Sequence, residues 1–258
     1  MTRWPTVACL VLATWAAVRA DESVVKREWT VGGTKREAFV HAPPAATTTA
    51  TPVLFVFHGH GGTARYCAEH WALHDKWPEA LVVYAQGLKT PTKRDPNGEG
   101  TGWQTAAGEQ GDRDLIFIDA VLASLEKDYK VDKGRVFATG HSNGGGFCYL
   151  LWAERGDRFT AFAPVAAAAR SFKGMKPHPA LQVAGKNDQV LPFASQEQTM
   201  KELRRIDECE PEGKVWEKGI LYPSRSGASF VACIHDGGHE QPDGANDLIV
   251  KFFRELPR

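Results

Sequence analysis

The stretch RVFATGHSNGGGF, residues 135–147, decides the fold of this chain. A β-prone run ends at Thr139 and leads directly into Gly140-His141-Ser142-Asn143-Gly144, after which the pattern becomes helical. This order is the Gly-x-Ser-x-Gly nucleophile elbow, a sharp strand-to-helix turn that presents a serine hydroxyl. Glycines flank the serine because a side chain there would collide with neighbouring backbone. We therefore predict that Ser142 is a nucleophile and that the N–H of Asn143, at a helix N-terminus, binds a developing oxyanion. A glycine-rich loop without a catalytic role is the alternative for the pentapeptide alone.

Strands and helices alternate along most of the chain. Continuous apolar runs at 53–57 and 81–84 are typical of strands covered on both faces. Apolar residues at helical spacing between 114 and 129 indicate an amphipathic helix, and short antiparallel edge strands are expected at 28–31 and 37–41. The alternation predicts an α/β fold with a mostly parallel central sheet, helices on both faces and antiparallel N-terminal edge strands. Ligands bind such sheets beyond the carboxyl ends of the strands. The remaining expected elements are strands at 135–139, 160–166, 180–184 and 229–234, and helices at 63–76, 195–209 and 245–255.

Composition sets the broad class. The chain has 258 residues, of which 43% are hydrophobic and 24% charged, with 31 basic and 31 acidic residues. The balanced charge gives no indication of a nucleic-acid partner, and no apolar stretch is long enough to span a membrane. Residues 1–20 contain Arg3, then an apolar run, then small residues near residue 20, which predicts a secretory signal peptide; a disordered or core-packed N-terminus is the alternative. We expect a secreted or periplasmic protein with a single catalytic domain over 21–258, as a monomer or weak oligomer.

Export would place the cysteines in an oxidising compartment, where disulfides form. Beyond the predicted signal the cysteines are Cys67, Cys148, Cys209 and Cys233. Cys209 closes a helical pattern and Cys233 lies in a late strand, so a bridge between them is one hypothesis. The other is that all four are buried thiols. No Cys-x-x-Cys pair occurs, so a zinc ribbon is not expected.

A serine hydroxyl is a poor nucleophile at neutral pH and needs a histidine base that a carboxylate orients. Three histidines follow Ser142 in the chain. His178 precedes a strand and His235 is still close to strand register, whereas His239 lies in a turn after the last strand. His239 is therefore the predicted base, with a solvated loop histidine as the alternative.

The carboxylate is expected on a loop that follows an intervening strand. Asp188 meets this condition, whereas Asp157 and Asp207 belong to helices or to their ends. Asp236 is close in sequence to His239 and stays an open alternative. With Asp188 as the partner, the chain order is Ser–Asp–His, the order of α/β-hydrolases.

A second glycine-rich loop, His58-Gly59-His60-Gly61-Gly62, follows the first apolar strand. Glycines let backbone N–H groups face a substrate oxygen without obstruction. We predict the N–H of His60 as the second oxyanion donor, with Gly61 as the next choice and as a substrate contact; an ordinary tight turn is the alternative. Trp103 lies in the long irregular segment 87–111, where its indole is expected either to wall the substrate pocket or to pack under its own loop.

No cofactor is expected, because acyl transfer by such residues needs none. His70 and His74 lie four apart on one helical face, a spacing that can bind zinc. They do not form His-Glu-x-x-His and no third ligand is evident, so we expect hydrogen-bonded histidines and no metal.

With these residues assembled, the chain resembles the secreted α/β-hydrolase esterases grouped with polyhydroxybutyrate depolymerases and feruloyl or acetylxylan esterases. The resemblance covers roughly residues 35–255. It implies a serine carboxylic-ester hydrolase in which Ser142, His239 and Asp188 act together. The matching motifs are His58-Gly59-x-Gly61-Gly62, the segment 131–145 with its elbow, Gly185-x-x-Asp188-x-x-x-Pro192 and Gly237-Gly238-His239-x-x-Pro242.

The chain departs from this family at two places. Members often carry a cysteine where His60 stands and a cysteine-tryptophan pair near Trp103, and neither is present. No substrate-binding module is evident, which favours small or polysaccharide-linked acyl or feruloyl esters as substrates. The alternatives are a polyhydroxyalkanoate depolymerase, a prolyl-oligopeptidase-like peptidase and a non-catalytic binding protein on a hydrolase scaffold.

Overall fold

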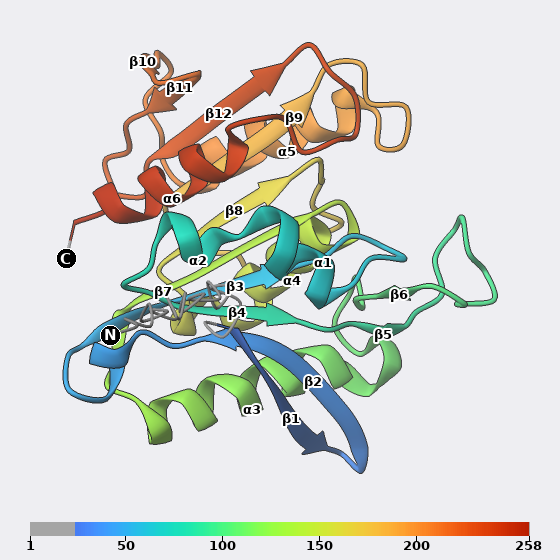
Figure 1. Cartoon of the computed structure of the whole chain (residues 1–258). Coiled ribbons are helices and arrows are strands. Elements are labelled where there is room, and N and C mark those ends of the chain that lie inside the picture. Colours follow the sequence, from blue (N-terminus) through green and yellow to red (C-terminus); the bar gives the residue numbers. More distant parts are fainter. Residues whose placement is uncertain (1–23, 258) are drawn as a thin grey trace, which may run out of the picture.

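The computed structural model describes residues 24–257, so the predicted signal peptide at residues 1–20 lies outside the described residues. Within that range ten strands form one twisted sheet (Figure 1). A small ribbon of β5 (Leu88–Lys89) and β6 (Thr101–Gly102) projects beside it. In sheet order the ten strands are β1 (Val24–Val31), β2 (Thr34–His41), β4 (Leu81–Ala85), β3 (Thr51–Phe57), β7 (Val131–His141), β8 (Ala161–Val165), β9 (Ala180–Gly185), β12 (Phe230–His235), β11 (Gly219–Tyr222) and β10 (Lys214–Trp216).

The centre of the sheet, from β4 to β12, is parallel throughout. Both edges are antiparallel, with β1 and β2 on one side and β11 and β10 on the other. The predicted α/β-hydrolase architecture with antiparallel N-terminal edge strands is therefore confirmed. The second hairpin, β10–β11, was not predicted, because its strands are only three and four residues long and lack a continuous buried apolar run.

Helices cover both faces of the sheet (Figure 1). One face packs against α3 (Arg113–Asp128), α4 (Asn143–Arg155) and α5 (Phe193–Ile206), and the other against α1 (Ala64–Tyr66), α2 (Leu73–Lys76) and α6 (Ala245–Glu255). Along β3 the side chains alternate between the two cores, because successive residues of a strand point to opposite faces. Phe55 and Phe57 enter the α3–α5 core, and Leu54 and Val56 enter the α6 core. None of the helices in residues 24–257 combines the length and apolar character that crossing a membrane requires.

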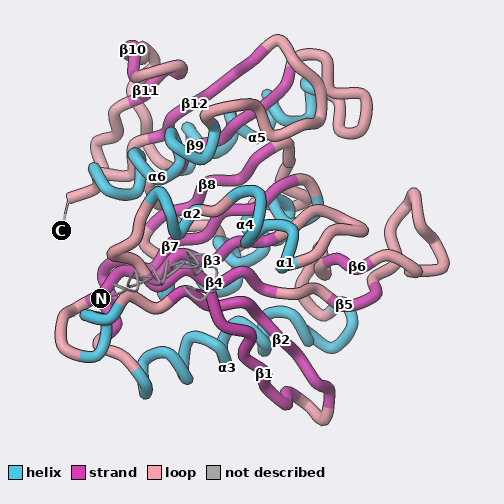
Figure 2. The backbone as a smooth tube through the Cα atoms, in the orientation of Figure 1, coloured by secondary structure: helices cyan, strands magenta, loops and turns pink. Residues whose placement is uncertain are grey.

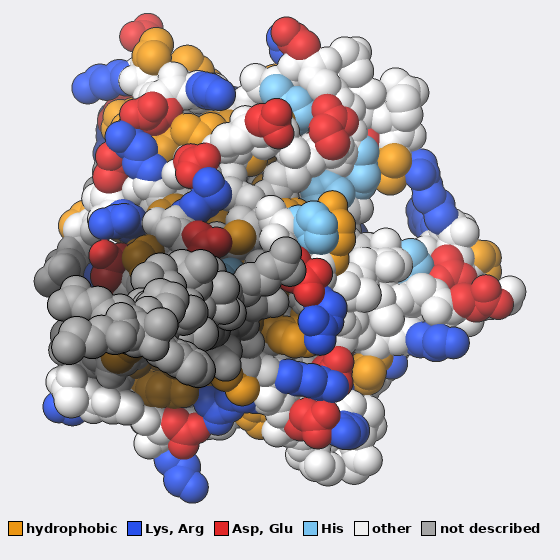
Figure 3. Space-filling view, in the orientation of Figure 1, with side chains coloured by type: hydrophobic (Ala, Val, Ile, Leu, Met, Phe, Trp, Pro, Cys, Tyr) orange, Lys and Arg blue, Asp and Glu red, His pale blue; other side chains and the backbone are white. Residues whose placement is uncertain are grey.

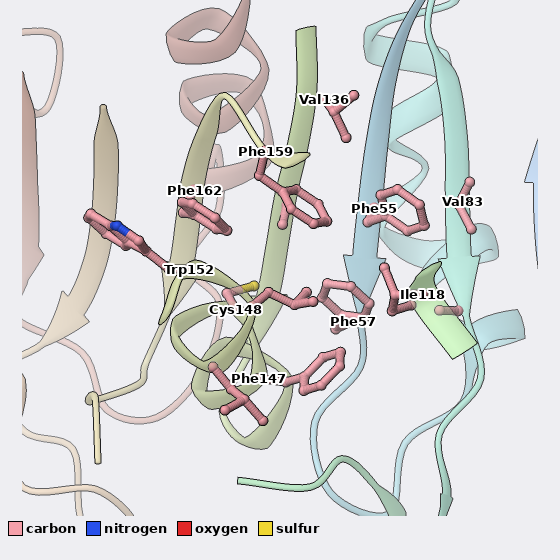
Figure 4. Close-up of a cluster of buried hydrophobic side chains, with 14 of the residues drawn as sticks. Phe55, Phe57, Val83, Ile118, Val136, Phe147, Cys148, Trp152, Phe159 and Phe162 are labelled. Atoms are coloured by element: carbon pink, nitrogen blue, oxygen red, sulfur yellow. The ribbon is translucent and has the colours of Figure 1, made fainter. Parts of the chain in front are cut away.

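Aromatic rings fill the α3–α5 core behind the elbow (Figure 4). Phe57 packs edge-to-face on Phe147 at a centroid distance of 5.0 Å, and Trp152 stacks on Phe162 at 5.1 Å. All four residues are almost fully buried. Burial of one such side chain is worth about 1.5–3 kcal/mol, so this cluster fixes α4 firmly against the sheet.

The structure does not form the hypothesised bridge between Cys209 and Cys233, since the four cysteines in the described part of the chain are all free thiols. The reason lies in the sheet. Cys233 belongs to the α6 core, whereas Cys209 packs against the α3–α5 core on the opposite face. Burial raises the pKa of the Cys233 thiol to about 12, which keeps it protonated.

His70 and His74 make hydrogen bonds within the protein. The His70 Nδ1 atom lies 3.1 Å from the carbonyl oxygen of Tyr66, and the His74 Nδ1 atom lies 2.8 Å from the hydroxyl of Tyr84. His70 is thus bonded within its own helical segment, and His74 links α2 to β4.

Asp207, just after α5, is fully buried, and its carboxylate accepts the backbone N–H of His178 at 3.1 Å. Burial raises the pKa of Asp207 from 3.8 to about 8. Between these two pH values the folded protein binds one more proton than the unfolded chain, so stability falls as pH rises. This group alone contributes a slope of about 1.4 kcal/mol per pH unit.

We expect Asp207→Asn to flatten the decline in the free energy of unfolding between pH 5 and pH 7, approximately the window set by that pKa. Urea unfolding at several pH values measures the slope. Asp157→Asn, at an exposed carboxylate, is the matched control. An unchanged slope in Asp207→Asn would show that this carboxyl is already ionised in the folded protein.

Candidate active site

Ser142 occupies the turn between β7 and α4. Its backbone lies at φ 55° and ψ −117°, a conformation that non-glycine residues rarely adopt and that surrounding structure must hold in place. The turn needs its glycines for close approach. A Cβ on Gly144 would lie 2.4 Å from the carbonyl oxygen of Phe57, and one on Gly140 would lie 2.7 Å from the backbone of Gly144. The tight turn of the elbow therefore requires glycine at positions 140 and 144.

The structure brings Ser142, His239 and Asp188 together from three loops at the carboxyl ends of β7, β12 and β9. The Oγ atom of Ser142 lies 2.7 Å from Nε2 of His239, and Nδ1 of His239 lies 2.7 Å from Oδ2 of Asp188. Because β9 and β12 are paired in parallel, the loops that follow them lie side by side (Figure 2). The Asp188 carboxylate is fully buried, whereas the His239 side chain keeps 19% exposure, enough to meet a substrate.

Two opposing effects set the pKa of Asp188. Burial acts to raise it, but hydrogen bonds from His239 and from the N–H groups of Leu191 and Val190 outweigh burial and hold the pKa below its ordinary value. Asp188 is thus ionised at neutral pH, as a partner for imidazolium should be.

The alternative residues lie elsewhere. Asp236 is exposed and pairs with Lys186 at 2.7 Å, and Asp157 pairs with Lys176 on the surface. The imidazole of His178 lies within hydrogen-bond distance of the carbonyls of Lys176 and Gly156, and His178 precedes the amino end of β9, whereas Ser142 follows the carboxyl end of β7.

The two glycine-rich loops meet at the elbow. Asn143 is the first residue of α4, and the first N–H groups of a helix have no partner within it. The N–H of Gly61 donates to the carbonyl of Thr101 at 2.7 Å, so Gly61 is excluded as an oxyanion donor. Gly61 also lies outside the lining of the cavity beside Ser142.

The prediction that Trp103 walls the substrate pocket is corrected by the structure. Trp103 is fully buried: its ring stacks on Phe147 at 5.1 Å and its indole N–H donates to the His58 carbonyl at 2.9 Å. The side-chain amide of Asn143 also binds both backbone polar groups of Trp103, at 2.7 and 3.1 Å. Trp103 therefore packs under its own loop, which was the alternative expectation, and its backbone holds the side chain of Asn143.

A cavity of about 830 Å³ opens beside Ser142, large enough for a drug-sized ligand. Its walls come from the β5–β6 loop, the segment before α3 and the loops after β8 and β9. The lining residues are His60, Pro91, Thr92, Lys93, Arg94, Pro96, Thr105, Glu109, Gln110, Ser142, Asn143, Arg170 and Val190.

Comparison with known proteins identifies the family, although no family model matches the sequence. A protein named "Probable feruloyl esterase C" from Aspergillus clavatus is 34% identical over 221 residues, which cover 78% of this chain and 76% of that protein. The chain belongs to the feruloyl esterase C family. The protein of the same name from Aspergillus niger is 33% identical over 174 residues, covering 61% of this chain and 62% of the relative.

Solved structures agree on the fold of this feruloyl esterase C family member. A ferulic acid esterase superposes with a TM-score of 0.62 at 16% identity, covering 90% of this chain and 97% of the other. An acetyl xylan esterase from Aspergillus awamori gives 0.64 at 13% identity, covering 89% and 99%. The relatives are named esterases, and the chain is accordingly a carboxylic ester hydrolase.

Two residues of this family member escaped the sequence analysis. The side-chain amide of Gln196, fully buried on the first turn of α5, donates to Asp188 Oδ2 and to the Leu191 carbonyl, both at 2.9 Å. The Nε2 atom of His141 lies 2.5 Å from the backbone carbonyl of His239. Gln196 thus holds the carboxylate of Asp188 in place, and His141 holds the backbone of His239. No sequence signal indicates the role of Gln196, because its contact with Asp188 is set by tertiary packing.

We expect Gln196→Met to lower kcat about tenfold with little change in KM. The variant keeps the side-chain length but removes a hydrogen bond to a carboxylate, worth about 1.5–3 kcal/mol, and so loosens Asp188 behind His239. Steady-state kinetics on a chromogenic ester provide the measurement. Gln198→Met, on the exposed face of the same helix, is the control. Equal kcat values for the two variants would mean that Gln196 has no positioning role.

Proposed function

We propose that this esterase works through a Ser142–His239–Asp188 triad and an acyl-enzyme intermediate. The observation that carries the proposal is the pair of 2.7 Å hydrogen-bond distances that join the three side chains in series. The buried, ionised state of Asp188 supports it further, because a carboxylate in that position fixes the imidazole tautomer.

The proposed reaction begins when Ser142 Oγ attacks the ester carbonyl while Nε2 of His239 accepts its proton. Asp188 accepts a hydrogen bond from Nδ1–H and stabilises the imidazolium that forms. His239 then donates the proton to the alcohol oxygen as the carbon–oxygen bond breaks. A water molecule, deprotonated by His239, attacks the acyl-enzyme, and Ser142 regains its proton when the acid leaves.

The tetrahedral oxyanion would be held by the backbone N–H groups of Asn143 and His60. The position of Asn143 at the start of α4 supports the first assignment, since the helix dipole adds to the N–H. The commitment of the neighbouring Gly61 N–H to Thr101 favours His60 as the second donor. One such donor stabilises a transition state by about 3–4 kcal/mol.

The proposed substrates are small or polysaccharide-linked acyl and feruloyl esters, met outside the cell after removal of residues 1–20. The names of the relatives, feruloyl esterase and acetylxylan esterase, support this substrate class. The size of the cavity beside Ser142 is compatible with an aromatic acyl group.

A fluorophosphonate probe and an ester panel test the proposal. We expect the probe to label the protein once, at Ser142, as located by mass spectrometry. We expect hydrolysis of methyl ferulate and acetylated xylo-oligosaccharides and none of the corresponding amides. Absence of labelling would refute the serine mechanism, and faster cleavage of amides would indicate a peptidase.

A further inference from the structure

The cavity beside Ser142 carries an excess of positive charge. Besides His60, the charged side chains that line it are three cations, Lys93, Arg94 and Arg170, and one carboxylate, Glu109. Arg170 lies 3.6 Å from Glu109, whose carboxylate also accepts hydrogen bonds from the N–H groups of Thr105 and Ala106. Arg170 and Glu109 therefore largely cancel, which leaves two cations, both on the β5–β6 loop.

Lys93 and Arg94 have no carboxylate partner in the part of the chain that the structure describes. Arg94 Nη2 donates to the carbonyls of Gln189 and Val190, at 3.3 and 3.1 Å. These acceptors are neutral, so they orient the guanidinium without compensating its charge. These two hydrogen bonds also connect the β5–β6 loop, which carries Arg94, to the loop that carries Asp188.

The acidic residues of the same loop do not compensate these cations. Asp95 Oδ2 is engaged by His60 Nε2 at 3.0 Å and by the N–H of Gly100 at 2.8 Å, and neither Asp95 nor Glu99 lines the cavity. Figure 3 shows Lys and Arg side chains beside the hollow between the projecting β5–β6 loop and the body of the molecule. The positive charge thus faces the space that a substrate must enter.

From this arrangement we infer that the enzyme prefers esters that bear a carboxylate, with Lys93 and Arg94 as the residues that recognise it. The inference rests on the proposed function, in which the same cavity binds the ester attacked by Ser142. A cleft lined by uncompensated cations concentrates anions and speeds their association. Arg94 keeps further N–H groups for a carboxylate, because both of these hydrogen bonds involve Nη2. Each exposed charge pair contributes a factor of about two to five.

Matched esters test this preference. The first arm compares 4-nitrophenyl valerate with mono-4-nitrophenyl glutarate, whose acyl chains are equally long but differ in a terminal carboxylate. The second arm places the carboxylate on the alcohol side, with acetylated glucuronic acid against acetylated glucose. We expect a higher kcat/KM for the anionic ester in at least one arm, and the arm that responds identifies which side of the ester faces the two cations.

In the Lys93→Gln/Arg94→Gln variant we expect the ratio of anionic to neutral kcat/KM to fall about tenfold. Added salt should lower the same ratio in the unmodified protein, because it screens exposed charges. Lys127→Gln, an exposed lysine of α3 that does not line the cavity, removes a positive charge elsewhere and should leave the ratio unchanged.

The inference would be overturned if the ratio of anionic to neutral kcat/KM were at or below one in both arms, or if the double variant left that ratio unchanged. Either result would leave the proposed ester hydrolysis unaffected. If the enzyme hydrolyses none of these four esters and does not hydrolyse methyl ferulate, the proposed function is refuted instead. The preference is then decided by binding: calorimetry on the Ser142→Ala protein compares monomethyl glutarate with methyl valerate. Tighter binding of the anion supports the inference, and equal affinities overturn it.

Discussion

The Ser142→Ala variant is expected to lose ester hydrolysis by a factor on the order of 10⁴–10⁶ in kcat. Without the hydroxyl, no acyl-enzyme forms and His239 has no proton to accept from a nucleophile. What remains is the rate that substrate binding and the oxyanion donors provide for attack by water. Initial rates on 4-nitrophenyl acetate, with active-site titration of the unmodified enzyme, give the ratio.

The substitution should leave the fold intact, because the Ser142 hydroxyl bonds to His239 and not to the surrounding core. Thermal unfolding of both proteins checks this point. Ser195→Ala, at an exposed serine near the start of α5, is the control for the loss of a hydroxyl. Turnover by Ser142→Ala that equals the unmodified rate would eliminate Ser142 as the nucleophile.

The Asp188→Asn variant is expected to reduce kcat by a factor of about 10⁴. An amide of the same shape fits the pocket, but its N–H₂ group would donate to Nδ1 of His239 and drive the ring proton to Nε2. An imidazole protonated at Nε2 cannot accept the proton of Ser142, from which it lies 2.7 Å away. The kcat of the variant between pH 6 and pH 9 measures the loss.

Asp236→Asn separates this effect from a general loss of negative charge near the site. Asp236 pairs with Lys186 at the surface, so its variant should keep kcat within about twofold of the unmodified enzyme. A deeper loss in Asp236→Asn than in Asp188→Asn would transfer the role of orienting carboxylate to Asp236.

Much of the fold was predictable from local patterns. The elbow around Ser142 carries its own steric requirement, and the apolar runs of β3 and β4 are typical of strands covered on both faces. Asp188 and His239 could be selected because chemistry in such a sheet collects on loops that follow strands. The structure brings these residues within hydrogen-bond distance.

Other features depend on contacts that a sequence does not display. The burial of Trp103 requires Phe57, Phe147 and the His58 carbonyl to surround it. The separation of Cys209 from Cys233 follows from the face of the sheet on which each lies. Gln196 reaches Asp188 only because the loop after β9 turns back onto the first turn of α5. In each case the partner is set by tertiary packing rather than by spacing along the chain.

The contacts of His60 bear on how the enzyme behaves under different redox conditions. Its ring fits against Gly100 and Gly102, where a Cβ would come within 2.7 and 2.9 Å of the imidazole nitrogens, and its Nε2 contacts Asp95. These contacts of His60 hold the segment 95–102, which borders the cavity, without sulfur chemistry. The fastening therefore needs no oxidant to form and no reductant can cut it, so the cavity should keep its shape across redox environments.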